Sequence, residues 1–512
     1  MKSLLSLSRR GISITIALSS FLTPTATAQR TSTTCDKDCQ GLVDMGIAFE
    51  RASHAHESLD DFYAIPEDFD ASMKPGTLLR VEEHTDITNY TVPGGLTMSR
   101  IMYTSESLNG TIVPVSAFVL WPYAPFEYEH NPHSPNSTFS SAHTSSSSSS
   151  STKFPLVAWA HGTSGVFPPC APSNYRSLQY NFMTAYNLAL DGFAVLATDY
   201  AGLGVTTLPD GAQSHTWLAS PAGANDVAYA IDAARKAFPS TLDADGPFVA
   251  MGHSQGGGVS WSFAERQAVH PQAGYRGAIS ISPATRVIDE IERAMEVVAS
   301  ASAEDPGTAD VPVWAPTALG LQVKVVAAVT AVYPEYNDAG MSEGAYDRWH
   351  NVLKPVGGCL PTDTLAFLGV TEQVRANWTA DPLVREWQDV ASAGRKAFRG
   401  PMLVIVGGED ALPVDMLEED VEATCAVAGN EGEGLEMAVY RGMQHFPVIQ
   451  ASRGKWMRWV NEKVSTLAGH NGGVCGKKTV VQGFNTEYTS HAITPNWLVT
   501  WAPPMEAWKY AL

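Results

Sequence analysis

The chain is poor in positive charge and in long hydrophobic runs. Its 33 lysines and arginines are outnumbered by 53 aspartates and glutamates, which gives a formal net charge of −20 at pH 7. Because nucleic acids and anionic lipids are themselves negative, so acidic a chain argues against both as partners. After residue 28 no stretch is apolar for the roughly 20 residues that a membrane-spanning helix needs. We therefore expect no nucleic-acid partner and no later transmembrane segment.

Signatures of cofactor binding are also missing. The chain has no Gly-rich phosphate loop, and Gly202-Leu203-Gly204 lacks the third glycine and the opening helix of a dinucleotide fingerprint. His54 and His56 lie close together, but no cysteine or carboxylate accompanies them at metal-ligand spacing, which favours a solvated helix face. We expect neither a metal ion nor an organic cofactor.

The N-terminus has the pattern of a secretory signal. A positively charged start and the apolar run Ile12–Leu22 precede Ala26-Thr27-Ala28, a small-x-small cleavage pattern. We predict a signal peptide over 1–28 and a secreted, extracellular mature chain that starts at Gln29. An uncleaved anchor is the alternative, but the apolar run is too short and too rich in serine to span a bilayer.

Secretion agrees with the cysteine content and the sequons. Six cysteines are an even set, as expected in an oxidising compartment. The sequence does not determine their pairing, and the pairs that we favour are Cys170–Cys359, Cys425–Cys475 and Cys35–Cys39. N-x-[ST] sequons predict glycosylation at Asn89, Asn109, Asn136 and Asn377. The Ser-rich stretch 130–152 is low-complexity, and we predict a disordered loop there.

Short apolar runs alternate with helical patterns along much of the chain. The runs that predict strands are Ile112–Leu120, Leu156–Ala160, Phe193–Thr198, Phe248–Met251, Ala278–Ser282, Leu403–Val406 and Met437–Tyr440. Their near-continuous apolarity is typical of a sheet covered on both faces. Between two of them, Asn225–Phe238 has one apolar helical face. This alternation predicts an α/β protein with a doubly wound, mostly parallel sheet.

The alternation is interrupted once. The segment 285–398 is alanine-rich and helical in tendency, and the strand pattern resumes after it. We interpret it as an inserted helical cap that divides the sheet domain into 29–284 and 399–469. The tail 470–512 has few helix signals and is expected to form an extension or a flap.

One motif indicates covalent catalysis. Gly252-His253-Ser254-Gln255-Gly256 matches G-x-S-x-G, with the predicted strand before it and a helical pattern, Gly257–Ala268, after it. Strand, sharp turn and helix are the context of a nucleophile elbow, in which glycines flank a strained serine. A second match at 340–344 follows a polar turn and is discounted. Ser254 is therefore the expected nucleophile.

A serine hydroxyl needs a histidine to accept its proton and a carboxylate to orient that histidine. In α/β-hydrolases the order along the chain is serine, acid, histidine. Asp410 follows the strand Leu403–Val406, and Glu409 beside it is the alternative. Carboxylates at this end of a parallel strand lie where such sheets build their sites.

The histidine is expected after one more strand. His445 lies in the loop that follows Met437–Tyr440 and precedes the last helical pattern. A lone loop histidine is usually solvated, but here the order and the flanking strand favour a general base. His470 and His491 lie beyond the final helix and are weaker candidates.

An oxyanion hole needs two N–H donors. The first is expected from Gln255, which follows the nucleophile. The second is expected in the loop His161-Gly162-Thr163, where glycine lets the backbone approach the substrate carbonyl. We favour the N–H of Thr163, with that of Gly162 as the alternative, and expect His161 to brace the loop.

With these motifs in place, the chain resembles the secretory lipase family of fungi, the lipase-A-like branch of the α/β-hydrolases, over most of its mature length. The matching segments, besides the elbow and the Asp410 loop, are Asp61-Phe62-Tyr63 with Pro66, Pro75–Arg80, Tyr103-Thr104-Ser105, Trp121-Pro122, His161-Gly162-Thr163 and Asp199–Gly204. The elbow departs from the family, which often has an aromatic residue where His253 stands and glycine where Gln255 stands.

The resemblance implies an α/β-hydrolase fold and a secreted carboxylic-ester hydrolase with a helical cap over an acyl-binding channel. It also implies that Asp199 and Tyr200 are structural or line the site. Its substrate would be a small-molecule or lipid ester, cleaved through an acyl-enzyme. Contact with a lipid interface and the oligomeric state stay open. The alternatives are an acetyl esterase or acyltransferase acting on a secondary metabolite, a serine peptidase, and a catalytically silent hydrolase-fold binding protein.

Overall fold

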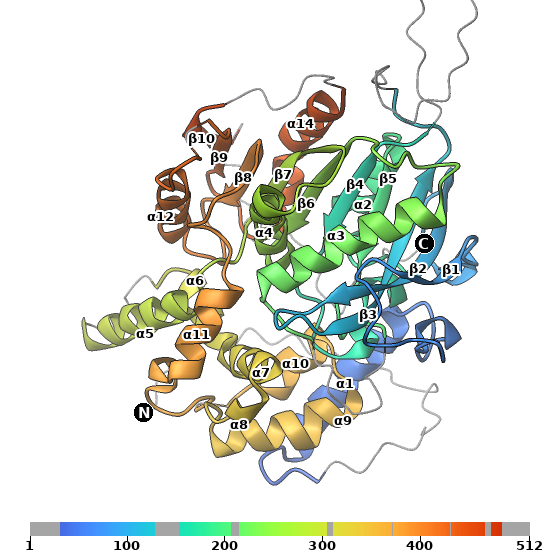
Figure 1. Ribbon diagram of the computed structural model, residues 1–512. Helices are drawn as coiled ribbons and strands as arrows, with labels where there is room; N and C mark the ends of the chain where they lie inside the picture. The colour runs from blue at the N-terminus through green and yellow to red at the C-terminus, as the bar shows by residue number, and fades with distance from the viewer. Residues whose placement is uncertain are drawn as a thin grey trace, which may run out of the picture.

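The computed structural model describes residues 31–127, 153–205, 215–304, 311–370, 372–430, 432–465 and 473–483. The expected signal peptide, the Ser-rich stretch 130–152 and Asn136 lie outside the described residues. The central feature is a ten-stranded sheet with the order β1-β2-β3-β5-β4-β6-β7-β8-β9-β10 (Figure 1).

The sheet is antiparallel at one edge and parallel over the rest. The strands are β1 (Leu78–Glu82), β2 (Leu96–Glu106), β3 (Ile112–Pro122), β4 (Leu156–Ala160), β5 (Ala194–Thr198), β6 (Phe248–His253), β7 (Tyr275–Ile281), β8 (Met402–Gly407), β9 (Leu435–Tyr440) and β10 (Cys475–Val481). In the run β5-β4-β6-β7-β8-β9-β10 every neighbouring pair is parallel. The pairs β1–β2, β2–β3 and β3–β5 are antiparallel. The predicted mostly parallel sheet and all seven predicted strands are confirmed.

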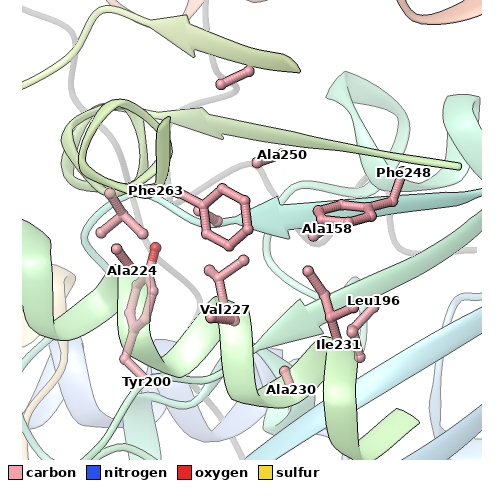
Figure 2. Close-up of a cluster of buried hydrophobic side chains, with 14 of the residues drawn as sticks. Ala158, Leu196, Tyr200, Ala224, Val227, Ala230, Ile231, Phe248, Ala250 and Phe263 are labelled. Atoms are coloured by element: carbon pink, nitrogen blue, oxygen red, sulfur yellow. The ribbon is translucent and has the colours of Figure 1, made fainter. Parts of the chain in front are cut away.

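Helices cover both faces of the sheet. The helices of the sheet domain are α2 (Ala185–Leu190), α3 (Ser220–Ala237), α4 (Gln255–Val269), α12 (Val414–Cys425), α13 (Pro447–Ala451) and α14 (Arg453–Ser465). One apolar core joins α3, α4 and α12 to the sheet, and a second joins α2, α13 and α14 to the opposite face. Alternate strand residues enter different cores, because side chains alternate across a strand. Figure 2 shows Val227 and Ile231 of α3 and Phe263 of α4 gathered over Leu196 and Ala250.

The segment between β7 and β8 is helical. It contains α5 (Val287–Glu304), α6 (Trp314–Gly320), α7 (Gln322–Val332), α8 (Glu343–Arg348), the π-helical turn Trp349–Leu353, α9 (Lys354–Val356), α10 (Leu360–Ala366) and α11 (Pro382–Ala391). We call these helices the cap. They gather at one end of the sheet around a separate apolar core (Figure 1). Short 3₁₀ turns complete the fold at Asp61–Tyr63, Ile87–Asn89, Pro168–Cys170, Pro172–Asn174, Asn181–Met183, Pro334–Tyr336 and Trp378–Ala380.

The cap is completed by residues from outside the insertion. Helix α1 (Lys37–Ser53) lies against α10, and its Glu50 accepts the backbone N–H groups of Cys359 (3.0 Å) and Thr362 (2.8 Å). These are otherwise unpaired donors at the start of α10, where a carboxylate is also favoured by the helix dipole. Trp217 and Leu218, which precede α3, belong to the same apolar core. The core of the cap therefore draws on three separate parts of the chain.

Three disulfides are present in the structure. Cys35 is bonded to Cys39, Cys170 to Cys359, and Cys425 to Cys475. These are the pairs favoured from the sequence. The second disulfide ties the loop after β4 to the start of α10, and the third ties the end of α12 to β10.

The described residues 473–483 of the tail contain a further strand of the sheet. Cys475–Val481 is strand β10, which pairs in parallel with β9 at the sheet edge. Strands β1 and β2 were also not expected from the sequence. The second G-x-S-x-G match proves to be ordinary helix structure, because Ser342 has φ −67° and its side chain caps α8.

The asparagines of the described sequons lie on the surface. Asn89, Asn109 and Asn377 are exposed, so each is accessible to the modification that the sequence predicts. Among the described residues no single helix is long and apolar enough to cross a membrane. The bent pair α6–α7, with an angle of 49°, passes that test by length and composition.

Candidate active site

The backbone at Ser254 has the strained turn that the motif predicts. Ser254 lies between β6 and α4 with φ 59° and ψ −119°, and its N–H donates to the carbonyl of Ile281 at 2.9 Å. A Cβ added at Gly252 would lie 1.9 Å from the carbonyl oxygen of Gly256, and one added at Gly256 would lie 2.0 Å from that of Ala160. Both glycines of the motif are therefore required by the close approach of backbone atoms.

Asp410 and His445 meet at the carboxyl ends of adjacent strands. Asp410 follows β8 and His445 follows β9, and Asp410 Oδ1 lies 2.6 Å from His445 Nδ1. The carboxylate is fully buried, whereas the histidine side chain is 15% exposed. Ser282, which follows β7, donates its hydroxyl to Asp410 Oδ2 at 2.6 Å. Glu409, the alternative acid, is exposed.

The surroundings of Asp410 favour its ionised form. Burial raises the pKa of the carboxyl, but the nearby His445 and the hydrogen bonds from His445 and Ser282 outweigh it, and the pKa is lowered overall. Because the carboxylate accepts the Nδ1–H of His445, the Nε2 atom of this histidine carries the lone pair. A neutral imidazole held in this tautomer can accept a proton on the side away from Asp410.

A hydrogen-bonded chain of buried side chains links His445 to the loop after β4. The Gly162 N–H donates to the Tyr180 hydroxyl (3.1 Å), which lies 2.8 Å from His253 Nδ1, and His253 Nε2 lies 2.9 Å from the His445 carbonyl oxygen. Since a carbonyl only accepts, His253 donates from Nε2 and accepts the Tyr180 O–H at Nδ1. Burial lowers the pKa of His253 to about 3, so it is neutral as this pattern requires.

The loop after β4 lies against the elbow. A Cβ added at Gly162 would be 3.2 Å from Ser254 Cβ. The Gly162 N–H already donates to Tyr180, whereas Thr163 is half-buried next to it. This pairing favours Thr163 over Gly162 as the second oxyanion donor.

His161 braces this loop. Its ring is buried and contacts the carbonyl oxygens of Gly162 (2.7 Å) and Asp199 (3.2 Å), and burial lowers its pKa to about 3. Tyr200 donates its hydroxyl to the His161 carbonyl at 3.0 Å. Asp199 is buried, which raises its pKa to about 6, and it accepts hydrogen bonds from Ser116 and Ser173. Asp199 and Tyr200 thus hold the loop through their bonds to His161.

The sequence did not indicate every residue of this site. Ser282 could have been found, because it directly follows β7 at the edge where the other groups lie. Tyr180 carries no comparable signal, since it lies in an irregular segment 73 residues before its partner His253. Its role follows only from the folded chain.

No cluster of three or more histidine, cysteine or acidic side chains that could hold a metal ion occurs within the described ranges. His54 is buried against Tyr175 with ring centroids 4.7 Å apart, and burial lowers its pKa to about 4. The expectation of a solvated helix face is therefore wrong for His54, because α1 ends there and folds back onto the sheet domain.

Known proteins of similar fold support this arrangement of the sheet. Residues 176–305 match the family model described as "Serine aminopeptidase, S33". The structure of Candida antarctica lipase A in its closed state superposes with a TM-score of 0.58 and 13% identity, covering 82% of this chain and 89% of that chain. A mutant of the rice cell wall degrading esterase LipA from Xanthomonas oryzae gives 0.53 and 16%, covering 76% and 100%. No curated protein matches the chain in sequence. The chain has the α/β-hydrolase fold, with a helical cap inserted between β7 and β8.

Proposed function

We propose that the protein is a secreted serine carboxylic-ester hydrolase of the lipase-A-like kind. One observation carries the proposal: the strained Ser254 turn and the Asp410–His445 pair stand at the carboxyl ends of neighbouring parallel strands. This is where such sheets place their active sites. The disulfides agree with an oxidising compartment.

The first half of the reaction acylates the serine. Ser254 Oγ attacks the ester carbonyl carbon while His445 Nε2 accepts its proton, and the carbonyl electron pair moves onto oxygen. The N–H groups of Gln255 and Thr163 hold this oxyanion, and Asp410 stabilises the imidazolium. As the oxyanion collapses, the C–O bond to the alcohol breaks and His445 protonates the leaving alkoxide. The acyl group stays on Ser254.

The second half releases the acid. Water loses a proton to His445 Nε2 as its oxygen attacks the acyl carbon, and the same two N–H groups hold the second oxyanion. Collapse breaks the bond to Ser254 Oγ, which takes the proton back from His445. These steps use only side chains, backbone N–H groups and water.

Ester substrates are favoured over amides by the structural neighbours, which are named as a lipase and an esterase. The aminopeptidase description of the matching family model supports peptide hydrolysis as the second candidate. An acetyl esterase or an acyltransferase would use the same Ser254 chemistry, with a smaller acyl group or with an alcohol in place of water.

The test is hydrolysis of p-nitrophenyl esters from acetyl to palmitoyl, with aminoacyl p-nitroanilides as the competing substrates. We expect ester hydrolysis and a fall in kcat of about 10⁴-fold or more in Ser254→Ala, because a triad without its nucleophile retains only binding and oxyanion effects. Faster turnover of the anilides would favour the peptidase. Ester hydrolysis that persists in Ser254→Ala would contradict the nucleophile assignment.

A further inference from the structure

Residues 215–217, which precede α3, hydrogen-bond to both residues proposed as oxyanion donors. Trp217 Nε1 lies 2.9 Å from Thr163 Oγ1, and His215 Nε2 lies 3.0 Å from Gln255 Nε2. We call residues 215–217 the clamp segment. Thr163 follows β4 and Gln255 follows the elbow at the end of β6, so one short segment is bonded to residues at the ends of two strands.

The bond between His215 and Gln255 depends on a single tautomer. His215 Nδ1 lies 2.9 Å from the Ala201 carbonyl oxygen, which can only accept, so the proton is on Nδ1. Nε2 is then free to accept the amide N–H of Gln255. Both side chains are buried, and burial lowers the pKa of His215 to about 4. The ring also stacks on Tyr200 at 5.9 Å, which fixes its plane.

The bond between Trp217 and Thr163 has one possible direction. An indole Nε1–H can only donate, so the Thr163 hydroxyl accepts. Trp217 is 2% exposed, whereas Thr163 is half-buried in the loop after β4. The bond therefore ties the Thr163 side chain to a residue inside the protein, and it restricts the position of the Thr163 backbone.

Trp217 of the clamp segment also packs in the cap core. The Trp217 ring belongs to the cap core, and the Lys324 ammonium of α7 lies 5.9 Å from its centroid. Lys324 is itself paired with Asp363 of α10. Leu360, the first residue of α10, donates its N–H to the Ser164 carbonyl at 2.9 Å. The cap therefore also contacts the loop that contains Thr163.

We propose that Trp217 and His215 are positioning residues that hold the two oxyanion donors, so that the packing of the cap sets how well the site stabilises the oxyanion. This inference rests on the proposed ester hydrolysis and extends it. Oxyanion stabilisation is sensitive to geometry, since donors act at 2.7–3.1 Å and a displacement of about 1 Å can cost roughly 100-fold in rate. Residues that fix the donors therefore affect kcat without contacting the substrate.

The experiment compares Trp217→Phe, Thr163→Val and the double variant on p-nitrophenyl acetate and longer esters. Each single variant removes one side of the same hydrogen bond. We expect each to lower kcat about 10-fold with KM within about 2-fold, by the same factor for every acyl chain, because the oxyanion is common to all. The double variant should be no worse than the singles, since the pair acts as a unit.

Trp378→Phe is the matched control. The Trp378 indole donates to Gln322 Oε1 at 3.3 Å inside the same cap core, and neither residue bonds to Thr163 or Gln255 in the described structure. Its loss should lower the melting temperature as much as that of Trp217→Phe but leave kcat unchanged. Circular dichroism and melting curves for all variants separate folding losses from catalytic ones.

Three results would count against the proposal. Unchanged kcat in folded Trp217→Phe, an equal kcat loss in Trp378→Phe, or a loss that depends on acyl length would overturn the positioning role. The last would place Trp217 on the acyl path instead. Labelling of Ser254 by a fluorophosphonate is measured in parallel. A wild-type protein that is neither labelled nor active would refute the proposed function itself, whereas a labelled and active one with an unaffected Trp217→Phe variant refutes only the positioning.

Discussion

The proposed base and the proposed oxyanion donors both lie at the carboxyl ends of the parallel strands, but different parts of the chain hold them. His445 donates its Nδ1–H to Asp410, which follows β8, and its backbone carbonyl accepts the Nε2–H of His253, which ends β6. Thr163 and the loop around it are held by Trp217, by the start of α10 and by the disulfide to Cys359. The base is thus supported by the sheet domain, whereas the loop that contains Thr163 is held by the sheet domain and also by Trp217 of the cap core and by the start of α10.

From this difference we expect the cap residues that contact the Thr163 loop to affect catalysis. Changes at the contacts between the cap and the Thr163 loop should alter oxyanion stabilisation and leave proton transfer intact, whereas changes around β8 and β9 should do the reverse. The chain offers matched pairs of substitutions that test this separation.

The largest effect is expected on the base side. Asp410→Asn should lower kcat about 10⁴-fold, because an amide cannot hold His445 in the tautomer with a free Nε2. Glu409→Gln, next to it but exposed, should change kcat by less than about 2-fold. Steady-state kinetics on p-nitrophenyl butyrate measures both. The reverse result would assign the acid to Glu409.

The next effect concerns the cap side. Replacing Cys170 and Cys359 together by alanine should lower the free energy of unfolding by about 2–5 kcal/mol. It should also lower kcat about 10-fold, because Gly165 of the oxyanion loop packs on this disulfide. Urea unfolding and initial rates measure the two quantities.

The control for this prediction is the double alanine variant of Cys425 and Cys475. That disulfide joins α12 to β10 at the far edge of the sheet, so its loss should cost similar stability with kcat unchanged. Equal falls in kcat for both double variants would mean that loss of stability, and not the oxyanion loop, limits activity.

The smallest effect tests one contact between the cap and the acid. Glu290 of α5 is 5% exposed, its Oε1 has no hydrogen-bond partner, and burial followed by the charge of Asp410 raises its pKa to about 8. Between pH 4.5 and 8 the folded state keeps a proton that the unfolded state loses, so this group lowers stability as pH rises. Glu290→Gln should therefore gain stability over wild type on going from pH 5 to pH 8, on the order of 2 kcal/mol.

Melting temperatures of both proteins from pH 5 to pH 8 check this prediction. The control is Glu296→Gln, because Glu296 lies on the same helix but is exposed. The melting temperature of this variant should differ from that of wild type by the same amount at every pH. A difference between wild type and Glu290→Gln that does not vary with pH would show that the Glu290 carboxyl does not retain its proton in the folded state.

The strands and the positions of Ser254, Asp410 and His445 could be predicted because their signals are local. Each residue lies within five residues of the end of an apolar run long enough to be a buried strand, and their order along the chain is that of α/β-hydrolases. Strands β10 and β2 were missed for physical reasons. β10 is exposed for much of its length, so CGKKTVV shows no apolar pattern. β2 contains Arg100, which is buried only because Asp60 and Glu82 pair with it.

The supports of the site could not be predicted. Tyr180, His215 and Trp217 act through partners 73, 40 and 54 residues away, and nothing in their own surroundings marks them. Buried polar groups must find partners in the folded state, but the sequence does not say which. His54 illustrates the same limit, since its burial depends on a pairing with Tyr175, which lies 121 residues further along the chain.

The mixed origin of the cap core has a consequence for how such enzymes can be recombined. A graft that exchanges only the chain between β7 and β8 would leave Val43, Trp217 and Leu218 behind, and they would face a foreign surface. The carboxylate of Glu50 would lose the helix end that it caps across 309 residues of sequence. The exchangeable module is therefore a discontinuous one, in which α1 and the turn before α3 must travel with the inserted helices.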